Sequence, residues 1–248
     1  MAVVEARGLS KMFMVTRNPA ENLKVHFVGW FDSRQRERRE ARWALRDVDL
    51  TVGAGECVGL IGPNGSGKST LLRLLAGIFP ATQGQLRIEG RVAPMIELGV
   101  GFHPDLTGRE NVYLSTSLFG LPRAETDRLY APIVAFSGLD DVMDLPVKSY
   151  SSGMQMRLGF AIAAHLEAEL LLIDEVLAVG DEAFRHKCIE RLARIRSEGR
   201  AIVLVSHELA LVEMLCDRAC LLLGGRLVAE GPPAAVIERY HGVARTSG

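Results

Sequence analysis

The sequence predicts an α/β fold built around a parallel sheet with helices on both faces. Three short apolar runs each end in polar residues: "CVGLI" (57–61) before a glycine-rich turn, "LLLI" (170–173) before Asp174-Glu175, and "AIVLV" (201–205) before Ser206-His207. Uniformly apolar runs of this length, with helical patterns between them, are typical of strands that are covered on both faces. Because ligands of such sheets bind beyond the carboxyl ends of the strands, we expect the three polar sets to converge on one site.

The composition is that of a single α/β domain. The 248 residues, 48% of them hydrophobic and 24% charged, suffice for a substantial core. A formal net charge of -1 lacks the basic excess of a nucleic-acid surface, so we expect no nucleic-acid partner. No stretch approaches the roughly 18 uncharged apolar residues of a membrane span, and the N-terminus lacks a signal-peptide pattern. We therefore expect the chain by itself to be cytosolic and soluble.

The four cysteines, Cys57, Cys188, Cys216 and Cys220, are expected to be reduced and packed. They form no CxxC pair and are too few for a disulfide framework. Cys216 and Cys220 have the spacing of one helix face, but no matching histidine or cysteine ligands lie nearby in the sequence.

The remaining segments predict an inserted helical lobe and a C-terminal hairpin. Between 92 and 166 the sequence has little strand character, with helix starts at Thr107 and Arg123 and several Gly and Pro stops. Near the end, "CLLLGGRLVAEGPP" predicts two strands joined through Gly224-Gly225, followed by a short helix over 234–240.

The glycine-rich turn after the first apolar run has the pattern of a phosphate-binding loop. It matches G-x-x-x-x-G-K-S, and its residues are Gly62, Pro63, Asn64, Gly65, Ser66, Gly67, Lys68, Ser69 and Thr70. Glycines let such a loop wrap so that its N–H groups point at the β- and γ-phosphates, Lys68 adds a positive charge there, and Ser69 supplies a Mg²⁺ ligand. Because the turn follows a strand and precedes the apolar helix "TLLRLLAGI", it predicts a nucleotide phosphate site rather than an ordinary strand-to-helix turn.

The polar residues after the other two runs are the groups that phosphoryl transfer needs. Asp174 ends its strand where a carboxylate can hold the metal through water, and Glu175 is placed one residue further on to polarise the attacking water. His207 follows the third strand, in position to hydrogen-bond the γ-phosphate or the water. Such residues at strand ends are often structural, but beside a phosphate loop the catalytic interpretation is favoured.

A second helix start has the features of an anion site. The stretch "SYSSGMQMRLGF" (149–160) opens with hydroxyls and a glycine and continues into an apolar helical pattern. Ser151, Ser152 and Gly153 favour a cap and leave N–H groups free at the positive end of the helix dipole. The chain therefore has two candidate phosphate sites, although many helix starts of this kind are plain caps.

Together these residues resemble the ATP-binding subunit of an ABC transporter, over nearly the whole chain. In that family the phosphate loop, the Asp-Glu pair and the Ser-His pair recur in this order, and "YSSGM" occupies the place of the "LSGGQ" signature. The resemblance implies a P-loop NTPase (RecA-like) core with a parallel sheet, an N-terminal antiparallel β-subdomain and an inserted helical lobe. The implied lobes of this single nucleotide-binding domain are a catalytic core at 1–94 and 167–248 and a helical lobe at 95–166.

The resemblance also implies how two phosphate sites work together. In this family the signature helix binds the γ-phosphate of an ATP held by a second copy of the subunit, in a head-to-tail ATP sandwich dimer. Asp181 lies where the family has its dimer-contact aspartate. ATP would favour the closed dimer, and hydrolysis with phosphate release would favour opening. The implied cofactors are ATP and Mg²⁺.

Two further site residues follow from the same resemblance. Glu97, in "MIELGVGFHPDLTGREN", stands near the family's usual metal-sensing glutamine and can still ligate Mg²⁺ through water. Phe13, in "LSKMFMV", fits the position of the aromatic residue that stacks on adenine, whereas a core role for Phe13, with Trp43 or an aromatic of the insertion on the base, is the alternative.

The Glu97 region, the "YSSGM" variant and an insertion at 17–42 together look like the branch that exports lipid-linked polysaccharides such as O-antigen, capsule, galactan or teichoic-acid polymers. The implied function is ATP hydrolysis that drives a separate transmembrane permease, at the cytoplasmic face of the inner membrane, with the lipid-linked glycan as an indirect partner. If the chain ends naturally soon after "VIERYHG", no glycan-binding domain selects the substrate in cis.

The insertion itself has an aromatic and apolar first half and an arginine-rich second half. This amphipathic character suggests contact with the permease or with the membrane surface. A flap packed on the chain's own sheet is the alternative.

Two rival functions share most of these residues. An ATPase of another transporter branch, a drug exporter or an importer, has every catalytic residue, and only the Glu97 region and the insertion argue against it. A soluble ABC-type ATPase that acts on nucleic acid or ribosomes tends to have two fused cassettes, coiled-coil arms or basic surfaces, none of which the sequence shows.

Overall fold

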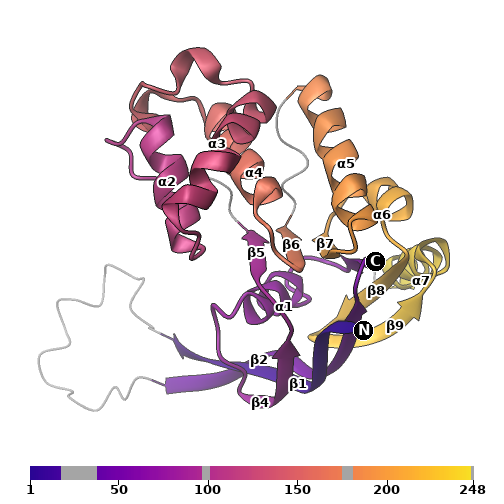
Figure 1. Cartoon of the computed structure of the whole chain (residues 1–248). Helices are drawn as coiled ribbons and strands as arrows, with labels where there is room; N and C mark the ends of the chain where they lie inside the picture. Colours follow the sequence, from indigo (N-terminus) through magenta and orange to yellow (C-terminus); the bar gives the residue numbers. More distant parts are fainter. Residues whose placement is uncertain (18–37, 97–100, 175–180, 247–248) are drawn as a thin grey trace, which may run out of the picture.

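Two sheets organise the fold, one mainly parallel and one antiparallel. The computed structural model describes residues 1–17, 38–96, 101–174 and 181–246. Within these ranges the larger sheet has six strands in the order β5-β6-β7-β3-β8-β9, and the smaller has three in the order β2-β1-β4 (Figure 1). The predicted α/β fold, with a parallel sheet and an antiparallel N-terminal sheet, is confirmed.

The apolar runs of the sequence form the central parallel strands. These are β3 (Cys57–Ile61), β6 (Leu170–Asp174) and β7 (Ala201–Val205). β7 lies between the other two and pairs in parallel with both. Every residue of β3 and β7 is buried, because other elements cover both faces of the sheet.

Three further strands complete the large sheet on either side of the central three. β8 (Arg218–Leu223) pairs in parallel with β3, and β9 (Arg226–Gly231) returns antiparallel to it, as the hairpin pattern predicted. At the other edge β5 (Val92–Met95) pairs in parallel with β6. Here the sequence prediction was wrong, since this stretch was expected to have little strand character; four residues with a proline among them give almost no strand pattern.

Two other expectations near the C-terminus need correction. The last helix, α7 (Pro233–Thr246), is longer than the predicted 234–240, because no proline follows its first turn and a helix tolerates Gly242 at modest cost. Cys216 directly follows α6 (Leu209–Leu215) whereas Cys220 lies in β8, so the two do not share a helix face. All four cysteines are free and buried, as predicted.

The antiparallel sheet is built around β1 (Ala2–Arg17), which pairs with β2 (Arg38–Gly53) and with β4 (Gln83–Ile88). Its pairing with β2 continues to Arg17 and Arg38, so residues 38–42 of the predicted insertion belong to β2. The pairing with β4 stops at Ser10, and beyond it the β1-β2 ribbon projects from the sheet (Figure 1). Residues 18–37, the rest of the insertion, lie outside the described residues.

α1 (Lys68–Leu75) lies between the two sheets. Its four leucines join one face of the large sheet to the buried side chains of β1 and β2 in a single apolar cluster. The opposite face of the large sheet packs against α4 (Ser152–His165), α5 (Glu182–Ser197), α6 and α7. The layered arrangement explains why the central strands are apolar throughout rather than alternating.

The helical lobe has an apolar cluster of its own. α2 (Gly108–Leu118), α3 (Arg123–Ser137) and α4 contribute to it, together with the two 3-10 turns Asp140–Val142 and Val147–Ser149 (Figure 1). Both predicted helix starts are confirmed, since Thr107 caps α2 in a capping box with Glu110 and α3 begins at Arg123. No helix of the described residues is long and apolar enough to cross a membrane.

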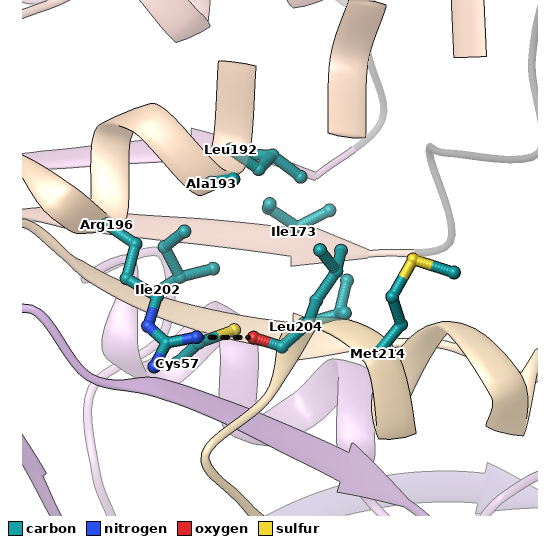
Figure 2. Close-up of a pocket in the computed structure, with 9 residues that line it drawn as sticks. Cys57, Ile173, Leu192, Ala193, Arg196, Ile202, Leu204 and Met214 are labelled. Atoms are coloured by element: carbon teal, nitrogen blue, oxygen red, sulfur yellow. Dashed lines mark hydrogen bonds between the residues drawn. The ribbon is translucent and has the colours of Figure 1, made fainter. Parts of the chain in front are cut away.

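A small cavity of about 90 Å³ lies between the central strands and helices α5 and α6 (Figure 2). Its lining is apolar apart from Arg196, which donates to the carbonyl oxygen of Leu215 at 3.4 Å. Cys57 lies at its wall, and the thiol of Cys57 is 3.5 Å from that of Cys216. This contact and burial raise the pKa of the Cys57 thiol. The cavity therefore lies at the border of the core, between buried strand residues and the exposed Met214.

Gly59→Ala tests the close packing at the centre of β3. A Cβ at this position would lie 2.5 Å from Val212 Cγ1 and 3.1 Å from Cys216 Sγ. We expect the free energy of unfolding to fall by about 1 to 3 kcal/mol, as overpacked cores do. Gly242→Ala is the matched control, because a Cβ there meets nothing within 4 Å and should leave stability unchanged or slightly raised. Denaturant unfolding measures both, and equal midpoints would contradict the packing around β3.

Candidate functional site

The sheet order brings the three predicted polar sets to one edge. β6, β7 and β3 are parallel neighbours, so Asp174, Ser206-His207 and the loop at 62–67 all follow the carboxyl ends of adjacent strands. Asp174 is half-buried and His207 is exposed. The structure thus places these residues together, as the apolar runs predicted. Glu175 lies outside the described residues.

Glycines give the loop at 62–67 its shape. Gly62, Gly65 and Gly67 have φ values of 146°, 75° and 111°, in the region that favours glycine. Gly67 is also the N-cap of α1 and brings no side chain to the first N–H groups of that helix. Those groups therefore stay accessible to an anion at the positive end of the helix dipole.

Two polar side chains are buried inside this loop. Lys68 is 6% exposed, and its Nζ donates to the carbonyl oxygens of Gly62 at 2.7 Å and Pro63 at 3.0 Å. The hydroxyl of Ser66 is buried and has no hydrogen-bond partner among the described residues. Leaving such a hydroxyl unsatisfied costs about 1 to 3 kcal/mol. A phosphate oxygen would accept from the lysine ammonium and from the N–H groups of the loop, so the loop fits a phosphate group.

The turn between β8 and β9 holds the loop from the side. Gly225 N donates to the carbonyl oxygen of Ser66 at 2.9 Å, and the carbonyl oxygen of Gly225 accepts from Arg46 N at 2.8 Å. Gly225 has a φ of 80°, and a Cβ there would lie 2.7 Å from the carbonyl oxygen of Ala44. Sequence reasoning identified Gly224-Gly225 only as a hairpin turn. The signal in the sequence was that both residues of the turn are glycine, although a hairpin turn can use another residue at one of the two positions.

α4 begins at the second predicted anion site. Ser151 is its N-cap, and Ser151 Oγ accepts from Met154 N at 3.2 Å. Ser151 and Ser152 are exposed, whereas Gly153 is half-buried. Because the capping bond satisfies one N–H group of the first turn, the remaining ones and the Ser152 hydroxyl are the donors that an anion would meet.

The opposite end of α4 is held by two arginines that sequence reasoning missed. Arg191 donates to the carbonyl oxygen of Ala164 at 2.9 Å, and Arg200 donates to those of Leu166 and Ala168, both at 2.7 Å. Burial lowers the pKa of both arginines, but a guanidinium stays charged at neutral pH. Cations thus cover the negative end of the helix dipole, while the positive end remains open.

Comparison with known proteins identifies the family of the chain. The family model described as ABC transporter matches residues 45–178. The chain belongs to the ABC transporter family. It is 49% identical to an O-antigen export system ATP-binding protein of Klebsiella pneumoniae, over 79% of this chain and 80% of that protein. It is 40% identical to a teichoic acids export ATP-binding protein of Levilactobacillus brevis, over 96% of this chain and 64% of that protein.

The fold of this ABC subunit agrees with a solved structure of the same kind. The ATP-binding subunit of an ABC transporter superposes with a TM-score of 0.76 and 26% identity, over 96% of this chain and 93% of that one. The P-loop NTPase fold class is therefore confirmed. Membership also makes the chain an ATP-binding protein and an ATPase, as the phosphate loop indicated.

The predicted metal ligands are only partly described. Ser69, in the first turn of α1, is exposed, and Asp174 ends β6 nearby in the sheet order. Their hydroxyl and carboxylate oxygens are ligands that Mg²⁺ accepts together with nucleotide phosphates. Glu97 lies outside the described residues. Mg²⁺ binding by the ABC subunit stays a prediction.

Two residues assigned by resemblance have contacts of their own. Asp181 is the N-cap of α5, where its carboxylate accepts from Phe184 N at 2.8 Å, and a dimer contact stays a prediction. Phe13 is half-buried in β1 and packs edge-on against Phe79, with the ring centroids 5.4 Å apart. Lys11 Nζ lies 5.1 Å from the centre of the Phe13 ring. Adenine stacking and core packing thus both remain open for Phe13.

A pair of glycine substitutions tests how the phosphate loop is held. Both Gly65 and Gly67 have positive φ, but only at Gly67 would a Cβ collide, at 2.7 Å from Leu45 Cδ2 and 2.8 Å from the carbonyl oxygen of Ala44. Gly65→Ala carries the backbone strain alone, about 1 to 2 kcal/mol. Gly67→Ala should lower the thermal midpoint further and weaken ATP binding more. Unfolding without nucleotide and nucleotide titration measure the two effects; equal losses would mean that β2 does not constrain the loop.

Proposed function

We propose that the chain is the ATP-hydrolysing subunit of an exporter that moves lipid-linked polysaccharide, of the O-antigen or teichoic-acid kind, through a separate transmembrane permease. The observation that carries the ATPase part is the loop at 62–67, which three glycines with positive φ shape and which holds the buried Lys68 at the carboxyl edge of the sheet. The relatives named for O-antigen and teichoic-acid export support the substrate class. The subunit would work at the cytoplasmic face of the inner membrane.

The residues at the sheet edge divide the work of hydrolysis. Loop N–H groups and Lys68 hold the β- and γ-phosphates, and His207 orients the γ-phosphate and the water. Glu175 accepts a proton as the water oxygen bonds to the γ-phosphorus, while the bond from that phosphorus to the bridging oxygen breaks and ADP and phosphate leave. Ser69 and Asp174 would hold Mg²⁺, which would supply positive charge beside the phosphate oxygens. Lys68 Nζ now donates to two carbonyl oxygens of its own loop, so it can exchange these acceptors for phosphate oxygens when ATP binds.

The first turn of α4 supplies the other half of the site. Ser151 and Ser152 are exposed, so they can face an ATP bound to a second copy of the chain. In such a head-to-tail dimer each γ-phosphate contacts both copies, which makes ATP favour the closed state. Hydrolysis and phosphate release remove those contacts and favour opening, and this cycle drives the permease.

Glu175→Gln tests the dimer cycle. An amide at this position cannot accept the proton from water, so we expect ATP to bind and to hold a dimer that does not turn over. Light scattering after size exclusion, with and without ATP, measures the mass. Glu190→Gln, a change at an exposed glutamate of α5, is the control and should hydrolyse ATP like the parent protein. A Glu175→Gln protein that stays monomeric under saturating ATP would count against the mechanism.

Depletion of the protein from its cells tests the substrate. We expect polyprenyl-linked glycan to accumulate on the cytoplasmic side and to be lost from the surface, and the wild type but not Glu175→Gln to restore export. Lipid extraction with quantification of both pools measures this. A normal glycan distribution would reject polysaccharide export and leave the ATPase standing.

One arm of that experiment addresses the insertion. Arg17 and Arg38 are cross-strand partners, so an Asn-Gly turn in place of 18–37 closes the hairpin without moving either strand. If the insertion contacts the permease or the membrane, this variant hydrolyses ATP at the basal rate but does not restore export. Full restoration would favour a dispensable flap.

A further inference from the structure

The turn before α4 rests on the segment that leads into α2. Four backbone hydrogen bonds join the two: Val147 N to Leu106 O at 2.9 Å, Lys148 N to Pro104 O at 2.9 Å, Gly108 N to Leu145 O at 3.1 Å, and Arg109 N to Met143 O at 2.9 Å. Two exposed ion pairs flank them, Lys148 with Asp105 and Arg109 with Asp144. The position of Ser151 thus depends on where the start of α2 lies.

Tyr150 fills the space between these segments. It is 6% exposed, belongs to the apolar cluster of the helical lobe, and donates from its phenol to the carbonyl oxygen of Val142 at 2.7 Å. A Cβ at Gly108 would lie 2.2 Å from the Tyr150 phenol oxygen and 3.1 Å from its Cζ. Gly108 is the first residue of α2 and has no positive φ, so its backbone conformation does not require glycine. The absence of a side chain instead leaves space for the Tyr150 phenol.

We propose that Tyr150 is a positioning residue for the composite nucleotide site, with its phenol seated in the space that Gly108 leaves. Tyr150 directly precedes the N-cap Ser151, so its anchoring sets where the first turn of α4 stands. Leucine, the family's residue in the signature, is shorter and has no donor for the carbonyl of Val142. Gly108 and Tyr150 therefore act as one unit. The proposal rests on the proposed function, because it requires the first turn of α4 to contact ATP in the second copy.

Substitutions at both positions test this unit in the Glu175→Gln protein. Gly108→Ala must displace the phenol by roughly an ångström, and a displacement of that size can reduce function by about a hundredfold. We expect the ATP concentration for half-maximal dimer to rise at least tenfold, on the order of 1.4 kcal/mol. Tyr150→Leu should also raise it. The double variant should lie closer to the parent than either single one, because the alanine fills space that the phenol vacates.

A milder variant keeps the test valid if Gly108→Ala folds poorly. Tyr150→Phe retains the ring and loses only the hydrogen bond to Val142, so the ATP requirement should rise about fivefold. Tyr113→Phe is the matched control: it loses a hydrogen bond to Asp127 on the exposed side of the same lobe and should leave dimer formation unchanged. ADP affinity should be unchanged in every variant, because ADP occupies the phosphate loop and lacks the γ-phosphate.

The outcomes separate the two proposals. A Glu175→Gln parent that forms no dimer with ATP would reject the proposed function. If the parent dimerises, and Gly108→Ala and Tyr150→Phe dimerise at the same ATP concentration, the positioning role is rejected and the function stands. A loss of ADP affinity that parallels the loss of dimer formation would show general disruption and overturn the proposal. The proposal is also overturned if the increases in the ATP requirement of the two single variants simply multiply in the double variant.

Discussion

The nucleotide site depends on a loop that must hold its fold while its N–H groups remain available to a phosphate. Most turns satisfy such groups internally; here Ser66 N donates to the carbonyl oxygen of Pro63, but internal bonds from every N–H group would close the site. The neighbouring elements therefore supply the constraint. Gly225 donates to Ser66 from the β8–β9 turn, and β2 packs against Gly67 so closely that no side chain fits. β2 and the β8–β9 turn thus constrain the loop at 62–67, in addition to contributing side chains to the apolar core.

Electrostatic balance follows from the same requirement. Lys68 is nearly buried, which is costly for an ammonium unless it is hydrogen-bonded, and two carbonyl oxygens of its own loop fulfil that need. In α4, two arginines bind carbonyl oxygens at the negative end of the helix dipole. The serines at its positive end are exposed. Both proposed phosphate sites are therefore prepared before any nucleotide arrives, and at the loop ATP binding would exchange existing partners of Lys68 instead of burying a bare charge.

The parts of the fold that sequence reasoning predicted correctly are those with local causes. Apolar runs predicted the central strands, the helix start at Thr107 predicted the beginning of α2, and a glycine pair predicted the β8–β9 turn. The parts that it missed have causes distant in the chain. β5 becomes a strand because β6 offers an edge, and Gly225 must be glycine because Ala44 lies against it. Likewise, nothing in the sequence near Arg191 and Arg200 indicates that these side chains bind carbonyl oxygens at the end of α4.

The start of the signature segment shows how the residue that fits at one position can depend on a residue distant in the sequence. Read along the sequence, Tyr150 is one departure from the family pattern, and Gly108 is an unremarked residue at a helix start. In three dimensions a tyrosine fits at 150 because 108 has no side chain, so the larger residue and the smaller one form a single packing solution. An ATP bound to one copy would be met by the helical lobe of the other. The stiffness of that lobe would then decide how the binding energy of the γ-phosphate is divided. A stiff lobe would leave most of it for dimer closure, whereas a loose one would lose part of it in ordering α4.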